Sequence, residues 1–566
     1  MLAAIVILIG VVVVSKVLRH MLAVVVMSMA VVFAFAIAPG TARAADTGAI
    51  TVDGTVATRY DAYQLFSATV VDDADADQKV ATDVAWANDT VRQAALPVLH
   101  DAGLDNSAST AQEAAEWMNA DGHMTTTLAA KLARAIYNAG APSVALNAGT
   151  TAELPCGYWL IVADDDAISQ GEAGTAPIMA LVGGSAVSVK PKAATPKVSK
   201  HVLEDSTAAW QKAADATVAD DLYWRLSATV PAGLAAYDTY TVRFVDTMSA
   251  GLDHSKVAAS MRVYVAAGAD GGFDAVQTGK DGRAGTDPAK GWTDITAQCA
   301  TKVAADGTFT VRTGDLIAAL GGADAFTAGA RVVAVYNAPL NSACNHGIAK
   351  GNPNEVYLRY PRSPFADQSG DAGFTRTPSD DACAYTWDLA LTKRGSDGDK
   401  PLAGAVLSIV DDRGRTLAAD GTWDADGKAT VTTGEDGRVT VSGVDSGKLE
   451  VRELKAPKGY TAFEGTRSVT VKAEGLDVDQ VAAAKPKLTI TAESPLRADS
   501  ADGSTGSLEA SLINTPTGTP PSITTGGFMP STGDMAMYAA AAAAVAGAAL
   551  IVVALLVKRG GGSHKE

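Results

Sequence analysis

Residues 385–393 read YTWDLALTK, a run in which apolar and polar side chains alternate. A β-strand turns successive side chains to opposite faces, so Trp387, Leu389 and Leu391 share one face with Lys393. Burying a lysine without a partner costs several kcal/mol, which makes a lysine in phase with a core face unusual. The run therefore predicts a core strand that carries a polar group into the interior.

Two later runs repeat this pattern with other polar residues. In residues 449–453 the residue in phase with the apolar face is Glu453, and in residues 508–514 it is Asn514. Leaving such groups buried and unpaired would be costly, so we expect both of them to meet Lys393. Asp-Gly and Ser-Gly turns between short alternating runs favour an all-β sandwich for this block.

The meeting of these three groups has a chemical consequence. Burial lowers the pKa of a lysine and raises that of a glutamate, which gives a neutral amine and a protonated carboxyl. Held together, they favour a single amide bond between Lys393 and Asn514, with loss of ammonia and assistance from Glu453. The event happens once, so no enzyme with turnover is expected. An unreacted, buried Lys393–Glu453 ion pair is the alternative.

Composition excludes several classes of protein. The 566 residues carry a net charge of −17, which argues against nucleic-acid binding, and their number predicts about three or four domains. The 4 cysteines form no CxxC pair and the 7 histidines are scattered, so we expect no metal and no cofactor. The sequence does not determine which of the cysteines, if any, form disulfides. No G-x-S-x-G or H-E-x-x-H motif supports a surface hydrolase, although paired carboxylates leave that class open.

Both ends of the chain are apolar. Residues 1–44 fit a signal peptide cleaved after Ala44, with a retained membrane hairpin as the alternative. Residues 535–557 are long enough to cross a bilayer as a helix, and Lys558 and Arg559 suit its cytoplasmic side.

Composition shifts divide the chain between these ends. We expect a mostly β protein with tandem Ig-like sandwich domains, helices added to the first domain, and a C-terminal transmembrane helix. The predicted segments are 45–192, 193–380, 381–516 and a linker over 517–528. Within the first segment, helices are expected near 84–102 and 110–139.

The segment before the C-terminal helix resembles a sorting signal. Met529, Pro530, Ser531, Thr532 and Gly533 are similar to the LPXTG motif of Gram-positive surface proteins, with methionine for leucine. The resemblance implies that a sortase cleaves between the last two of these residues and joins the threonine to an amine, which makes 529–566 a sorting signal. An ordinary single-pass anchor behind a chance turn peptide is the alternative.

Residues 381–516 resemble the Cna-B-like (SpaA-type, prealbumin-like) domain of Gram-positive pilins. The similarity is carried by LTK at 391–393, VRELKAPKGY at 451–460 and INTP at 513–516. It implies an intramolecular isopeptide bond between Lys393 and Asn514, with Glu453 as the assisting acid.

Residues 193–380 resemble the fimbrial isopeptide-forming domain. The similarity is carried by YTVRFVDTMSAGL at 240–252 and GNPNEVYLRY at 351–360. It implies a bond from Lys200 assisted by Asp246. The asparagine that the family has after the last strand is replaced by Arg362, and Asn354 is in phase with the core at the other end of that strand. An unreacted Lys200–Asp246 pair is therefore the alternative.

Residues 187–192, VSVKPK, resemble the pilin motif WxxxVxVYPK, with Gly183 for tryptophan and Lys190 for tyrosine. The resemblance implies that Lys192 attacks the sortase-bound Thr532 of another subunit, with Lys190 as the rival. A solvated linker lysine is the alternative.

Together these resemblances imply a shaft subunit of a covalent pilus on the cell wall. The implied partners are a class C-type pilin sortase, a housekeeping sortase, other copies of the chain and peptidoglycan, while the host ligand stays open. A wall-anchored adhesin displayed singly is the other structural interpretation.

Overall fold

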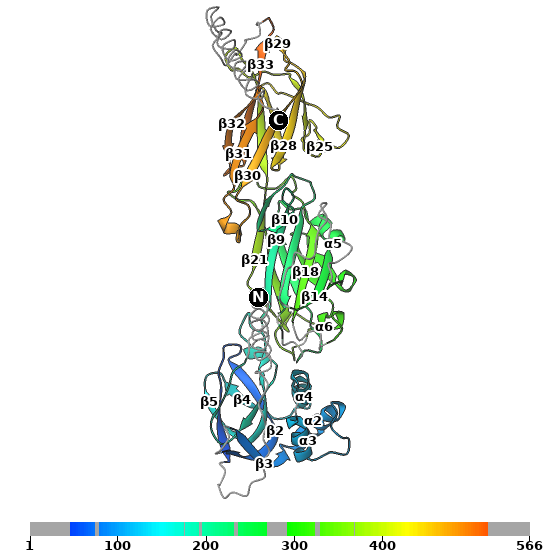
Figure 1. The fold of residues 1–566 in the computed structure, drawn as a ribbon, viewed down its shortest axis with the longest axis vertical. Helices are drawn as coiled ribbons and strands as arrows, with labels where there is room; N and C mark the ends of the chain where they lie inside the picture. The colour runs from blue at the N-terminus through cyan, green and yellow to red at the C-terminus, as the bar shows by residue number, and fades with distance from the viewer. Residues whose placement is uncertain are drawn as a thin grey trace, which may run out of the picture.

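The computed structural model describes residues 46–518, apart from 74–77, 121, 175, 192–194, 231, 233–235, 269–290, 323–328 and 367. The predicted signal peptide, Lys192, the sorting signal with Thr532 and the predicted helix at 535–557 lie outside the described residues. Within the described part, no helix is long and apolar enough to cross a membrane. The described chain is mostly β, and Figure 1 shows three regions stacked along its long axis.

The N-terminal region combines two sheets with a group of helices. One sheet has the order β3-β2-β6-β7 with β4 on β2, and the other has the order β5-β1-β8. The helices share a hydrophobic core with β2 and β6. The elements are β1 (Thr47–Val52), β2 (Arg59–Asp72), β3 (Lys79–Trp86), α2 (Asp89–Asp101), α3 (Ala111–Asn119), α4 (Thr126–Asn138), β4 (Val144–Asn147), β5 (Thr151–Pro155), β6 (Gly157–Ala163), β7 (Ile178–Val182) and β8 (Val187–Val189).

Helix capping shortens the helices that the sequence predicts. The helix expected at 84–102 begins at Asp89, because the Asn88 side chain accepts a hydrogen bond from the backbone of Val91. The helix expected at 110–139 is divided into α3 and α4. Thr125 caps the second of these helices, so the chain leaves helical geometry before it.

The middle region is a pair of sheets that share one core. Their orders are β10-β9-β12-β18-β14-β15 and β11-β21-β19-β13-β17-β16, with β20 on β19. The elements are β9 (Lys197–Glu204), β10 (Ala209–Gln211), β11 (Ala213–Asp215), β12 (Tyr223–Val230), β13 (Arg243–Met248), α5 (Val257–Ser260), β14 (Arg262–Ala267), β15 (Trp292–Asp294), β16 (Ala300–Val303), β17 (Thr308–Arg312), α6 (Leu316–Ala319), β18 (Ala330–Asn337), β19 (Asn352–Pro361), β20 (Phe374–Arg376) and β21 (Asp380–Tyr385).

The C-terminal region is a second pair of sheets around its own core. The orders are β27-β22-β33-β29 with β32 on β33, and β25-β24-β23-β28-β30-β31 with β26 on β23. The elements are β22 (Trp387–Gly395), β23 (Val406–Val410), β24 (Thr416–Leu417), β25 (Trp423–Asp424), β26 (Val431–Thr432), β27 (Arg438–Val444), β28 (Gly447–Lys455), β29 (Tyr460–Thr461), β30 (Thr466–Glu474), β31 (Lys487–Ala492), β32 (Leu496–Asp502) and β33 (Ser507–Pro516).

The change from the middle to the C-terminal region comes later than the predicted division after residue 380. Strand β21 pairs with β19 from Asp380 to Ala384, so it belongs to a middle sheet. The next strand, β22, begins at Trp387 and pairs with β27 and β33. The middle sheet therefore extends to Tyr385.

Candidate functional site: two buried lysine clusters

A polar cluster lies inside the C-terminal region. Lys393 is near the end of β22, Asn514 is near the end of β33, and Glu453 is on β28 of the facing sheet. Their exposed fractions are 0%, 2% and 6%. The alternation of apolar residues along each strand turns these side chains inward, and the structure brings the three together.

Glu453 contacts both partners in this cluster. Its Oε1 lies 3.6 Å from Lys393 Nζ and accepts a hydrogen bond of 2.9 Å from Asn514 Nδ2. Phe463 N donates to the other carboxylate oxygen at 3.1 Å, which fixes the position of the glutamate. Lys393 Nζ also donates to the carbonyl of Leu512 at 3.2 Å. The carboxylate therefore lies between the amine and the amide nitrogen.

Burial makes the amine at this position easier to deprotonate than an exposed lysine. Burial lowers the pKa of Lys393 to about 8, and the nearby charge of Glu453 partly opposes that shift. Asn514 Oδ1 is buried and has no hydrogen-bond partner among the residues described. The cluster thus combines a weakly basic amine, an amide and a carboxyl group in one buried space.

A second cluster lies inside the middle region. Lys200 on β9 and Asp246 on β13 both have 0% exposure and form an ion pair. The Tyr336 hydroxyl on β18 accepts from Lys200 Nζ at 2.8 Å and donates to Asp246 Oδ2 at 3.1 Å. Asn354, at 0% exposure, donates from Nδ2 to the same hydroxyl at 2.8 Å. The tyrosine therefore joins the lysine, the acid and an amide.

Sequence reasoning left Asn354 aside because it lies at the start of β19. Strands β13 and β19 run antiparallel, and Met248 at the end of β13 is opposite Asn354. The start of one strand therefore meets the end of the other, close to Asp246. Arg362 does not reach this cluster: its guanidinium donates to the carbonyl of Asp165 in the N-terminal region at 3.0 Å. The pairing direction of the two strands was the missing signal.

Burial also governs ionisation in the middle cluster. It lowers the pKa of Lys200 to about 8, and the neighbouring Asp246 opposes the shift. Burial raises the pKa of Asp246, and the Lys200 charge opposes that shift. Asp246 Oδ1 and Asn354 Oδ1 lack hydrogen-bond partners within the described chain. Both clusters therefore hold a lysine that loses its proton more easily than usual.

The pilin-like segment is described as far as Pro191. Strand β8 pairs in parallel with β1, so that Val187 is opposite Ile50 and Val189 is opposite Val52. Lys190 follows this strand and is exposed to solvent. Of the two predicted linking lysines, Lys190 is therefore accessible, while Lys192 lies outside the described residues.

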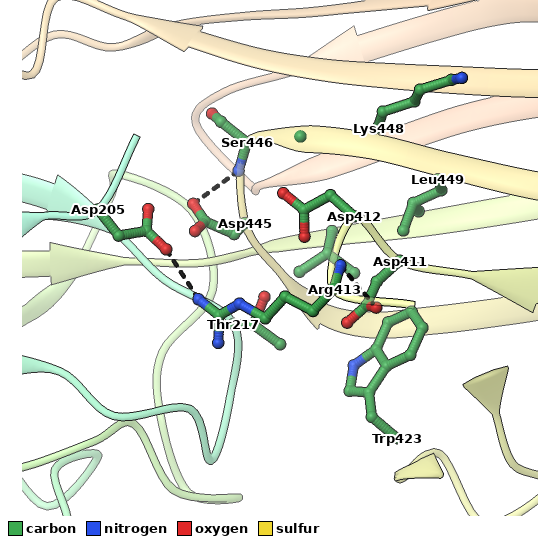
Figure 2. Close-up of a pocket in the computed structure, with 12 residues that line it drawn as sticks. Asp205, Thr217, Asp411, Asp412, Arg413, Trp423, Asp445, Ser446, Lys448 and Leu449 are labelled. Atoms are coloured by element: carbon green, nitrogen blue, oxygen red, sulfur yellow. Dashed lines mark hydrogen bonds and ion pairs between the residues drawn. The ribbon is translucent and has the colours of Figure 1, made fainter. Parts of the chain in front are cut away.

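Charged residues line the joint between the middle and C-terminal regions. Figure 2 shows Arg413 reaching across to Asp205, at 2.8 Å, with Asp445 nearby. Arg413 also pairs with Asp220 at 2.5 Å. Beneath this surface, Asp215 accepts a hydrogen bond of 2.6 Å from the Trp387 indole. Contacts between side chains thus hold the two regions against each other.

Part of the C-terminal region matches a known domain family. Residues 388–485 match the family model of the SpaA prealbumin-like fold domain. This match covers the strand of Lys393 and the strand of Glu453, and it ends before Asn514.

The chain is also similar to individual proteins in sequence and in structure. The chain is 30% identical over 143 residues to the trypsin-resistant surface T6 protein of Streptococcus pyogenes serotype M6, and the match covers 24% of each protein. The chain thus spans about a quarter of that relative's length. The solved T6 backbone pilin of Streptococcus pyogenes has a TM-score of 0.45 at 16% identity, with 86% of this chain and 100% of that chain covered.

Two other solved structures are major pilins. The full-length SpaD from Corynebacterium diphtheriae has a TM-score of 0.40 at 16% identity, covering 83% of this chain and 98% of that chain. The full-length RrgB from Streptococcus pneumoniae has a TM-score of 0.35 at 14% identity, covering 67% and 85%. All three of these solved structures are thus backbone or major pilins.

Proposed function

We propose that this chain is a backbone subunit of a covalently polymerised surface pilus, strengthened by internal isopeptide bonds. The observation that carries this proposal is the buried cluster of Lys393, Glu453 and Asn514 at the ends of β22 and β33. The matches to pilins support the same role.

In the C-terminal region the proposed reaction joins Lys393 Nζ to the side-chain carbonyl carbon of Asn514. The neutral amine attacks that carbon, the carbon–nitrogen bond of the amide breaks, and ammonia leaves. Glu453 contacts both nitrogens, so it suits the transfer of a proton from the attacking amine to the leaving one. No oxidant or cofactor is required.

The same chemistry is proposed for the middle region with Lys200 as the amine, Asp246 as the acid and Asn354 as the amide. The contacts of these residues through Tyr336 support this assignment. The alternative for each region is an unreacted lysine–carboxylate pair, which the same side chains would form without the bond.

These bonds would change how the chain carries force. Strands β22 and β33 are parallel neighbours, with Lys393 opposite Leu512 and Gly395 opposite Asn514. Tension enters the region through β22 and leaves through β33, so a bond between their ends would carry it directly. The intervening strands would bear little load. Closing a loop of this size is also worth about 5 kcal/mol against unfolding.

Polymerisation is proposed to join Thr532 of one subunit to Lys192 of the next by sortase, with Lys190 as the competing acceptor. A pilin sortase would build the shaft and a housekeeping sortase would attach it to peptidoglycan. The helix at 535–557 would hold the precursor in the membrane until cleavage, and the mature protein would lie outside the cell.

The experiment is a denaturing gel of wall extracts from cells that express Lys192→Ala or Lys190→Ala. We expect the high-mass ladder of the wild-type protein to disappear in Lys192→Ala and to persist in Lys190→Ala. Loss only in Lys190→Ala would reassign the acceptor. Ladders that survive both changes would overturn the proposed linkage, and a wild-type protein without ladders would favour the adhesin displayed singly.

A further inference from the structure

A thiol, an imidazole and a carboxylate lie in contact at the joint between the middle and C-terminal regions. Cys344 and His346 lie in the loop between β18 and β19, and Asp388 lies on β22. Cys344 Sγ is 3.5 Å from His346 Nε2, and His346 Nδ1 is 2.7 Å from Asp388 Oδ2. A base between a nucleophile and an orienting acid is the arrangement that activates cysteines in proteins.

The loop that carries the thiol and the imidazole is docked on the C-terminal region. Gly347 N donates to the carbonyl of Thr386 at 3.0 Å, and Ile348 N donates to that of Gly503 at 3.1 Å. These main-chain bonds come from the two residues that follow His346 and hold the loop against the C-terminal region. The arrangement therefore exists only while the two regions are docked.

The carboxylate is also fixed in position. Its Oδ1 accepts from Ser442 Oγ at 2.6 Å and from Gly443 N at 3.1 Å, while its Oδ2 faces His346. Asp388 Oδ2 lies 2.7 Å from Nδ1 without forming a hydrogen bond to it, and its negative charge favours an imidazole that has gained a proton. His346 Nε2 lies 3.5 Å from the Cys344 sulfur, so the imidazole is within reach of the thiol proton.

The thiol needs this base because its own surroundings keep it protonated. Burial, and then the negative charge of Asp388, raise the pKa of Cys344. The chain supplies a matched comparison in Cys299, which is also half-buried but donates from Sγ to the carbonyl of Ile295 at 3.3 Å. Burial raises the pKa of Cys299 to about 11. Among the described cysteines, Cys156 and Cys383 are buried, at 7% and 2% exposure.

We propose that Cys344 is a nucleophilic thiol that reacts with low-molecular-weight disulfides, with His346 as its base and Asp388 as a positioning residue. The thiol proton passes to Nε2, and the thiolate attacks one sulfur of the disulfide. The disulfide bond breaks, a mixed disulfide forms on Cys344, and the released thiolate takes the proton from the imidazolium. One sulfur is oxidised and one is reduced, so no other reactant is needed.

Small disulfides fit this position better than acyl substrates. Thiol–disulfide exchange requires access to one thiol only. Acyl transfer also requires hydrogen-bond donors that stabilise an oxyanion. Cys344 is half-buried and lies in a loop, whereas Cys156 and Cys383 are buried. The product would be a capped thiol at the joint.

The test is the rate at which cystine forms a mixed disulfide at each cysteine of the full-length protein in detergent, followed by peptide mass mapping. At pH 7 we expect Cys344 to react at least about tenfold faster than Cys299. His346→Gln should remove this advantage and leave a rate that rises only as the thiol itself ionises. Asp388→Asn, which keeps an oxygen for Ser442 and Gly443, should give an intermediate rate.

If His346 has only a structural role, His346→Gln should change the reaction rate of Cys344 in the opposite direction. Loosening the loop by His346→Gln would expose Cys344 and raise its rate. Such an increase, an unchanged rate and pH profile in that variant, or a Cys344 no faster than Cys299 in the wild-type protein would each overturn the proposal.

Discussion

The two lysine clusters share an amine, a carboxyl group and an amide but take them from different strands. In the C-terminal region the lysine and the asparagine lie on parallel neighbours of one sheet, and the acid comes from the facing sheet. In the middle region the acid and the asparagine lie on antiparallel neighbours, and the lysine comes from the facing sheet. The proposed bond would thus lie within one sheet in the first case and would cross between sheets in the second. The chemistry depends on which groups meet, not on which strands deliver them.

The largest effect is expected from Lys393→Ala. This change removes the proposed bond, worth about 5 kcal/mol, and leaves a cavity beside the buried Glu453. The melting temperature of the C-terminal region should fall by more than about 10 °C in calorimetry. Lys448→Ala is the control, because that lysine on β28 is exposed and forms a surface ion pair with Glu450. A fall no larger than in the control would contradict the assignment.

The comparison is tested next at Asn354, with Arg362, which stands at the family's usual asparagine position, as the control. Asn354→Ala should prevent the bond in the middle region and raise the intact mass by about 17 Da beyond the change of residue, because ammonia is no longer lost. Arg362→Ala should leave the bond in place, since Arg362 contacts the N-terminal region instead. A mass of Asn354→Ala that differs from the wild-type mass only by the substituted residue would exclude Asn354 as the partner of Lys200.

Tyr336→Phe tests the role of the tyrosine hydroxyl, which the described C-terminal cluster lacks. The hydroxyl contacts the lysine, the acid and the asparagine, so its loss should slow bond formation there by about 10²-fold. Bond formation in the C-terminal region should keep its rate. Mass spectra taken at intervals after cell-free synthesis measure both rates in one sample. Equal rates in the variant and the wild-type protein would show that the tyrosine is only structural.

A smaller effect is expected at the joint shown in Figure 2. Burial, followed by the charge of Asp215, raises the pKa of Glu204 to about 7, and Asp205 adds further negative charge. Asp445 lies nearby, and Arg413 pairs with Asp205. The stabilisation from the protonated Glu204 is fully present below about 4.5, where the unfolded glutamate titrates, and is lost as the pH rises through about 7.

Glu204→Gln should remove this pH dependence, because the amide stays neutral. The melting temperature of the wild-type protein should therefore fall from pH 5 to pH 8 by a few degrees more than that of the variant. Glu435→Gln is the control, since that glutamate is exposed. Equal slopes in the three proteins would exclude Glu204 as the titrating group.

The alternation of side chains along single strands predicted which residues of the candidate site point inward. It did not predict which of these residues from different strands meet. Alternation along single strands was enough to turn Lys393, Glu453 and Asn514 toward one core. It could not reveal that Asn354 meets Lys200, because that contact depends on the pairing direction of β13 and β19. The position of Asp388 beside His346 depends on the docking of two regions, which no local pattern encodes.

The most direct measurement of the central claim is the intact mass of the purified protein, compared with the mass of its own sequence after its first and last residues are determined. Two bonds predict a deficit of about 34 Da, with the linked peptides containing Lys393 with Asn514 and Lys200 with Asn354. A deficit of about 17 Da would retain one cluster and reject the other. A mass equal to that of the sequence would contradict the account.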